Sequence, residues 1–183
     1  GVRLVGSEMC IRDRPDSDLV IETTMDPQIQ ATTAKVIAET VQSKGEGSGF
    51  TQGASIVMRP DGSVLAIVGG VNYGRSQFNR ATAALRPPGS SFKPLVYLTA
   101  LNNGWEADST IEDAPIEKGK YRPRNFGHKY HGEVTLFEAL TWSLNTVAVN
   151  LAKDVGIDKV VSTARLLGIK TDLEPDLSLA LGS

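Results

Sequence analysis

Apolar residues follow two different periods along the chain, one typical of helices and one typical of strands. The helical period recurs over residues 27–45, 90–101, 135–142, 145–155 and 158–167. Short β-branched or apolar runs predict strands at residues 18–24, 54–58 and 64–68. No segment repeats, and no tract is of low complexity.

Local signals place several boundaries of these elements. Asp26 followed by Pro27 is the N-cap and first-turn proline of a helix, and Thr135 with Glu138 predicts a capping box. The sequence Pro60-Asp61-Gly62 joins two apolar runs, so we expect a β-hairpin there. Residues 105–132 have no clear period and predict a long surface loop, a kind of segment that often carries function.

Composition describes an ordinary globular chain and excludes several classes. The 183 residues carry a net charge of −2, which gives no basic surface for nucleic acid or for an anionic membrane. No apolar run approaches the roughly 20 residues of a membrane-spanning helix. Cys10 is the single cysteine, so neither a disulfide framework nor a cysteine-based zinc site is expected. We expect no cofactor and no metal.

Residues 1–14 match no helical or strand period and lack the apolar stretch of a signal peptide. Residues 6–14 resemble translated sequencing-adapter read-through, so we expect 1–14 to be a non-native leader and 15–183 to form one partial domain. Without this leader the chain contains no cysteine, which suits an oxidising, extracytoplasmic compartment. The sequence stops without a closing cap or polar tail, and we expect it to be truncated.

The spacing of Ser90 and Lys93 carries the first candidate chemistry. At the start of a helix, residues three apart lie on one face, where a hydroxyl and an amine can exchange a proton. Pro94 is tolerated only in a first turn, which puts Ser90 at the helix N-terminus, where free N–H groups favour developing negative charge. A lysine withdrawn from water can act as the base that activates a serine.

Neither this pair nor the second candidate triplet is specific by itself. A Ser-x-x-Lys arises by chance roughly 0.7 times in a chain of this composition, and Ser143-Leu144-Asn145 roughly 0.5 times. The triplet lies between two predicted helices, where an ordinary N-cap explains it equally well.

Longer strings in a fixed order resemble the transpeptidase domain of class A penicillin-binding proteins. They are Phe78-Asn79-Arg80-Ala81, Arg86-Pro87-Pro88-Gly89-Ser90-Ser91-Phe92-Lys93-Pro94-Leu95-Val96-Tyr97 and Ser143-Leu144-Asn145-Thr146-Val147-Ala148-Val149-Asn150. The resemblance runs over nearly all of residues 16–183. It implies an α+β fold of the β-lactamase and transpeptidase type, with part of an antiparallel sheet, helices against it and an all-helical subdomain.

The resemblance also implies roles for four residues. Ser90 would attack the D-Ala-D-Ala carbonyl of a peptidoglycan stem peptide and form an acyl-enzyme, with Lys93 as its base. Ser143 would relay the proton to the leaving amine, and Asn145 would hold the substrate amide and the lysine. A β-lactam would acylate Ser90 in the same way. An upstream glycosyltransferase domain, a membrane anchor and a periplasmic location are further implications.

The third motif of these proteins, Lys-Thr-Gly on a strand, is missing. Lys170-Thr171-Asp172 follows a predicted helix and has Asp172 where a residue without Cβ is needed, so we interpret it as a chance match. We expect the chain to stop before the true motif.

Several other polar residues are interpreted as structural. We expect Arg80 and Arg86 to make ion pairs, His128 and His131 to be solvated surface groups, and Trp142 to pack in the helical subdomain.

Two alternatives to the transpeptidase remain open. A serine β-lactamase or D,D-carboxypeptidase shares the acylation step but hydrolyses the adduct, for which we assign no base. The isolated fragment is alternatively an inert binding remnant, since an incomplete sheet leaves an unpaired edge.

Overall fold

The computed structural model describes residues 22–116 and 121–183. The chain divides into two compact units, Gly1–Leu85 and Arg86–Ser183. The leader over residues 1–14 and the first part of the strand predicted at 18–24 lie outside the described residues. Residues 22–24 form no strand, so that part of the prediction is wrong.

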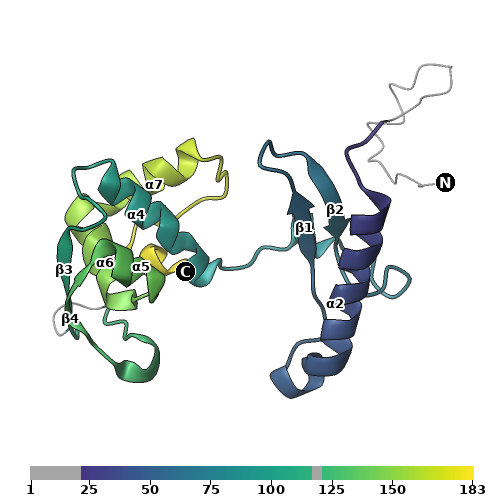
Figure 1. Cartoon of the computed structure of the whole chain (residues 1–183), viewed down its shortest axis with the longest axis horizontal. Coiled ribbons are helices and arrows are strands. Elements are labelled where there is room, and N and C mark those ends of the chain that lie inside the picture. The colour runs from purple at the N-terminus through teal and green to yellow at the C-terminus, as the bar shows by residue number, and fades with distance from the viewer. Residues whose placement is uncertain (1–21, 117–120) are drawn as a thin grey trace. The chain divides into compact units, whose positions relative to one another are not determined.

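The described part of the first unit consists mainly of a long helix and a hairpin (Figure 1). Helix α2 (Pro27–Ser48) begins after Asp26, whose side chain accepts hydrogen bonds from two N–H groups of the first turn, and it contacts strand β2. Strands β1 (Ser55–Met58) and β2 (Val64–Val68) pair antiparallel, as predicted. A short helix, α3 (Arg80–Ala83), follows β2.

Helix α2 continues past Gly45, where we expected it to end. A Cβ at position 45 would lie 2.4 Å from the carbonyl oxygen of Phe50, so this glycine lets the returning chain pass close to the helix. The helix ends at Gly49 instead, whose φ of 72° is the left-handed conformation common at helix ends.

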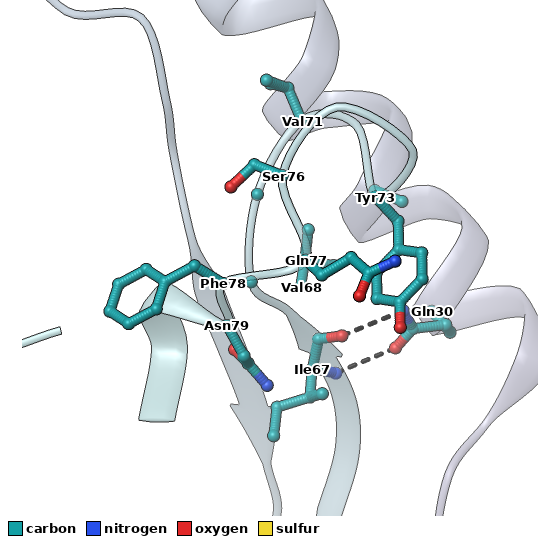
Figure 2. A pocket seen from close by; sticks show the side chains of 12 residues that line it. Gln30, Ile67, Val68, Val71, Tyr73, Ser76, Gln77, Phe78 and Asn79 are labelled. Atoms are coloured by element: carbon teal, nitrogen blue, oxygen red, sulfur yellow. Dashed lines mark hydrogen bonds between the residues drawn. The ribbon is translucent and has the colours of Figure 1, made fainter. Parts of the chain in front are cut away.

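The outer edge of β2 is covered by the chain's own polar groups. The Gln30 side chain accepts from Ile67 N–H (2.8 Å) and donates to the Ile67 carbonyl (3.0 Å), as a neighbouring strand would. Figure 2 shows this pair beside a cavity of about 420 Å³, with Tyr73 and Phe78 in its lining. These contacts stabilise the edge against pairing with another strand.

The second unit packs its helices around α6. Its elements are the short 3₁₀ turn η1 (Gly89–Phe92), α4 (Lys93–Leu101), β3 (Thr110–Asp113), η2 (Phe126–His128), β4 (Gly132–Thr135), α5 (Leu136–Thr141), α6 (Asn145–Val155), α7 (Ile157–Leu166) and η3 (Leu177–Leu181). Helix α4 packs against α6 and α7. Val96, Val147, Leu151 and Val160 are fully buried among them.

Local signals predicted the helices of this unit better than its strands. The capping box of Thr135 and Glu138 is present, and the three predicted C-terminal helices correspond to α5, α6 and α7. The stretch 105–132, predicted to be irregular, contains β3, and β3 pairs antiparallel with β4. Among helices of the described residues, none has the length and apolar character that crossing a bilayer requires.

A close backbone approach joins the end of the chain to the turn before Ser90. Gly89 N–H donates to the Gly182 carbonyl (3.3 Å), and a Cβ on Gly182 would lie 2.3 Å from the Gly89 carbonyl oxygen. Gly182 also has a φ of 74°, which L-residues rarely adopt. Only glycine fits here without moving η1.

We expect Gly182→Ala to lower the free energy of unfolding by more than the roughly 1–2 kcal/mol of the left-handed conformation alone, because the clash with Gly89 adds to it. The matched control is Gly104→Ala. Gly104 has a φ of 92°, but its Cβ would meet nothing within 4 Å. Chemical denaturation measures both variants, and equal losses in the two would show that the close approach has no energetic role.

Candidate active site

Ser90 and Lys93 lie one turn apart, but not in the regular helix that we predicted. Residues Gly89–Phe92 form a 3₁₀ turn, and α4 begins only at Lys93. The Lys93 N–H donates to the Ser90 carbonyl, and residues three apart eclipse one another in a 3₁₀ helix, so the two side chains share one side. Ser90 is exposed, whereas Lys93 is only 1% exposed.

The Lys93 amine is fixed by three oxygen atoms at the break between α5 and α6. It donates to the Ser143 carbonyl (2.5 Å), to Ser143 Oγ (2.9 Å) and to Asn145 Oδ1 (2.6 Å). An ammonium has three N–H donors, and these three acceptors use all of them. The structure therefore brings together three of the four residues proposed from the sequence, across about 50 positions of chain.

Ser90 Oγ is not one of the three oxygen atoms that bind the Lys93 amine. Among the hydrogen bonds of the described residues, none joins Ser90 Oγ to the Lys93 amine. The amine must release a proton before it has a lone pair that accepts the Ser90 hydroxyl. Burial lowers the pKa of Lys93 from 10.5 to about 8, which makes that release accessible near neutral pH.

Ser143 is held in an unusual backbone conformation. Its φ of 54° lies in the left-handed region, which is uncommon for residues other than glycine and is typical of functional sites. The alternative interpretation of Ser143 as an ordinary N-cap is wrong, because Leu144 is the N-cap residue of α6 and no side chain of that position caps the helix. The Ser143 side chain is thus free to bind Lys93.

Asn145 is held by residues that no pattern in the sequence predicted. Its Nδ2 donates to the Arg124 carbonyl (2.8 Å), and its N–H donates to Asn125 Oδ1 (2.8 Å). Asn125 in turn donates to Asp113 Oδ1 (2.7 Å). Isolated polar residues in a stretch without period gave no signal that would have found Asn125 or Asp113.

The predictions for the other polar residues had mixed outcomes. Arg80 donates to carbonyls of Gly69 and Phe78 and to Ser76 Oγ, so its role is structural, although through hydrogen bonds and not an ion pair. His131 is more than a solvated group, since its Nδ1 lies 3.0 Å from Asp113 Oδ2.

The environment of Trp142 also differs from the prediction. Its ring is half exposed, and its centroid lies 5.0 Å from that of His131, so it borders the surface near Ser143 instead of packing in the interior. The sequence Lys170-Thr171-Asp172 lies in a loop after α7 and in no strand, as its interpretation as a chance match requires. No group of three or more potential metal ligands occurs within residues 22–116 and 121–183.

The geometry supports proton exchange between the Lys93 amine and the Ser143 hydroxyl, which lie 2.9 Å apart. An exposed serine precedes a buried amine by one turn, and a second serine and an amide carbonyl hold that amine. Such an arrangement suits nucleophilic catalysis by a hydroxyl with a lysine as base. The large cavity beside Gln30 contributes none of these residues.

Comparisons with known proteins identify the family of the chain. A family model described as "Penicillin binding protein transpeptidase domain" matches residues 53–181. Penicillin-binding protein 1A of Aquifex aeolicus is 44% identical over 128 residues, which cover 67% of this chain and 18% of the relative. Penicillin-binding protein 1B of Vibrio cholerae is 37% identical over 180 residues, which cover 93% of this chain and 23% of the relative.

Solved structures show the same fold. The PonA1 protein of Mycobacterium tuberculosis in complex with penicillin V has a TM-score of 0.78 at 25% identity, covering 96% of this chain and 49% of that one. Penicillin-binding protein 1A of Haemophilus influenzae has a TM-score of 0.63 at 31% identity, covering 69% and 23%. The fold is therefore the predicted α+β transpeptidase fold. The chain spans about a fifth of the length of the curated relatives it matches.

The lowered pKa of Lys93 makes a prediction about stability. Between pH 8 and pH 10.5 the unfolded chain holds a proton that the folded chain has released, so stability rises with pH in this window. We expect the unfolding free energy of the wild type, relative to Lys93→Met, to rise by about 3 kcal/mol across it. Denaturant titrations of both proteins measure this difference, and an unchanged difference would exclude a buried amine with a lowered pKa.

Proposed function

The chain belongs to the family of penicillin-binding protein transpeptidase domains, and on that premise we propose that Ser90 is the nucleophile of an acyl-serine D,D-transpeptidase that cross-links peptidoglycan stem peptides. Lys93 is its base, Ser143 its proton relay, and Asn145 the group that orients the amine and the substrate amide. The observation that supports this assignment best is the shared amine: Lys93 Nζ lies within hydrogen-bond distance of both Ser143 Oγ and Asn145 Oδ1.

The first half of the proposed reaction forms the acyl-enzyme. Neutral Lys93 takes the Ser90 hydroxyl proton while Oγ attacks the carbonyl carbon of the terminal D-Ala-D-Ala peptide bond. The C–N bond then breaks, and the proton passes from Lys93 through Ser143 to the leaving amine. The products are D-Ala and an ester on Ser90, and Lys93 is neutral again.

The second half transfers the acyl group. The amine of a neighbouring stem peptide attacks the ester carbonyl, and Ser143 and Lys93 take its proton. As the ester C–O bond breaks, the leaving Ser90 Oγ receives that proton and becomes a hydroxyl again. A β-lactam follows the first half alone, because its opened ring keeps the leaving nitrogen attached. The penicillin V complex of the related PonA1 protein supports β-lactams as ligands of this site.

The relatives of this chain also indicate a wider context for it. Its relatives of similar sequence are penicillin-binding proteins 1A and 1B, several times longer than this chain. We propose that the chain acts on the extracytoplasmic side of a bacterial membrane, within a longer, membrane-anchored protein that also carries a glycosyltransferase domain.

We expect Ser90→Ala to abolish covalent labelling by a fluorescent penicillin, because it removes the only atom that bonds to the lactam carbonyl. The protein is expressed from the complete reading frame that encodes this chain. Ser91→Ala is the matched control, since Ser91 is the adjacent exposed serine, and it should label as the wild type does.

Equal labelling of Ser90→Ala and the wild type would remove Ser90 from this role. The lifetime of the adduct distinguishes the hydrolase alternative. A transpeptidase keeps the penicilloyl ester over many minutes, whereas a β-lactamase returns free enzyme and opened penicillin within the mixing time.

A further inference from the structure

The first turn of α6 has backbone donors that no neighbouring side chain satisfies. Helices leave their first N–H groups without internal partners, and a side chain at the N-cap position normally accepts one of them. The N-cap position here is Leu144, which is 4% exposed and belongs to the hydrophobic core. Its side chain anchors the helix start in the core, so the cap has to come from another segment.

Asn125 supplies this cap from the loop before β4. Its Oδ1 accepts from the N–H groups of Asn145 (2.8 Å) and Thr146 (3.2 Å), the first two residues of α6. Asn125 is 5% exposed, and its Nδ2 donates to Asp113 Oδ1 (2.7 Å) and to the Lys129 carbonyl (3.1 Å). Both ends of the amide are thus used, and its orientation is fixed.

The buried Asp113 carboxylate binds both Asn125 and the first turn of α6. The carboxylate is 1% exposed and accepts from Asn125 Nδ2, from Thr146 Oγ1, and from His131 N–H (2.9 Å) and Nδ1 (3.0 Å). Burial alone would raise the pKa of Asp113, but the hydrogen bonds from Thr146, Asn125 and His131 outweigh it and lower the pKa. The lowered pKa favours the charged form of Asp113, which is the form that accepts these hydrogen bonds.

Asn145 connects these buried contacts to the Lys93 amine. The N–H of Asn145 donates to Asn125 Oδ1, and its Nδ2 donates to the Arg124 carbonyl. Its Oδ1 accepts from the Lys93 amine. Two consecutive residues of one loop therefore fix both the backbone and the side chain of Asn145. A shift of this loop would move the oxygen that binds the amine.

We propose that Asp113, Asn125 and Thr146 are positioning residues for acyl transfer, forming a buried bracket that aims Asn145 at Lys93; this rests on the function proposed above. Because Asn125 of the bracket caps α6 from another segment of the chain, the side chains of Ser143 and Asn145 remain available to bind the Lys93 amine. A local N-cap would take up a side chain at this break. The core position of Leu144 excludes that solution.

The test compares one chemical change at two buried threonines. Thr146→Val removes the hydroxyl that binds Asp113, whereas Thr99→Val removes a hydroxyl of α4 that binds Thr163 and the Leu95 carbonyl and contacts none of the bracket residues. Thr146 is 0% and Thr99 is 1% exposed, so both variants lose a buried hydrogen bond. The measurements are the rate of acylation by a fluorescent penicillin and the melting temperature, in the protein from the complete reading frame.

We expect Thr146→Val to acylate at least tenfold more slowly and Thr99→Val to stay within twofold of the wild type, although both melt earlier. Thr146→Ser, which keeps the hydroxyl, should recover most of the lost rate. Labelling at Ser90 with an unchanged rate in Thr146→Val would overturn the bracket and leave the proposed function intact. A wild type that does not label at Ser90 would instead overturn the proposed function.

Asn125→Asp is a second test that keeps the shape of the side chain. Two carboxyl groups 2.7 Å apart cannot both be charged, so Asp113 and the new carboxyl must share a proton before the bracket re-forms. His131 and Tyr97 also face Asp113. We expect the acylation rate of this variant, relative to the wild type, to rise at least fivefold from pH 8 to pH 5.5. A ratio that does not change with pH would contradict the bracket.

Discussion

The burial of one amine governs the architecture around this site. Withdrawing Lys93 from water is costly unless its N–H groups find acceptors. All three acceptors come from the break between α5 and α6, about 50 residues later in the chain. The hydrogen bonds of one side chain thus join α4 to the start of α6 in addition to the apolar core. The same burial lowers the pKa of the amine to about 8, as the proposed role of a base requires.

Three adjacent residues at the break between α5 and α6 have different roles. Ser143 has a left-handed backbone conformation and binds the amine, and Leu144 lies in the core. Asn145 begins the next helix and binds the amine through its Oδ1. Because none of the three caps α6, the cap comes from Asn125. Catalytic candidates and structural groups thus stay separate while they lie in contact.

The sequence predicted what short-range signals determine. Asp26 with Pro27, the box of Thr135 and Glu138, and the turn between β1 and β2 each act within a few residues. The strands β3 and β4 were missed because they pair across a long connection and neither alternates clearly. The spacing of Ser90 and Lys93 showed that they share one side, whereas their meeting with Ser143 and Asn145 followed only from the family resemblance. Asn125 and Asp113 act through long-range contacts, so no local pattern predicted them.

The state of the Lys93 amine is the claim on which the account depends. Nuclear magnetic resonance of the protein labelled at its lysine side chains follows the titration of each amine directly. The account predicts one lysine with a titration midpoint near 8, below the ordinary 10.5, and the loss of that signal in Lys93→Met. If every lysine titrated near 10.5, the Lys93 amine would not be a buried base and the assignment of this site would be wrong.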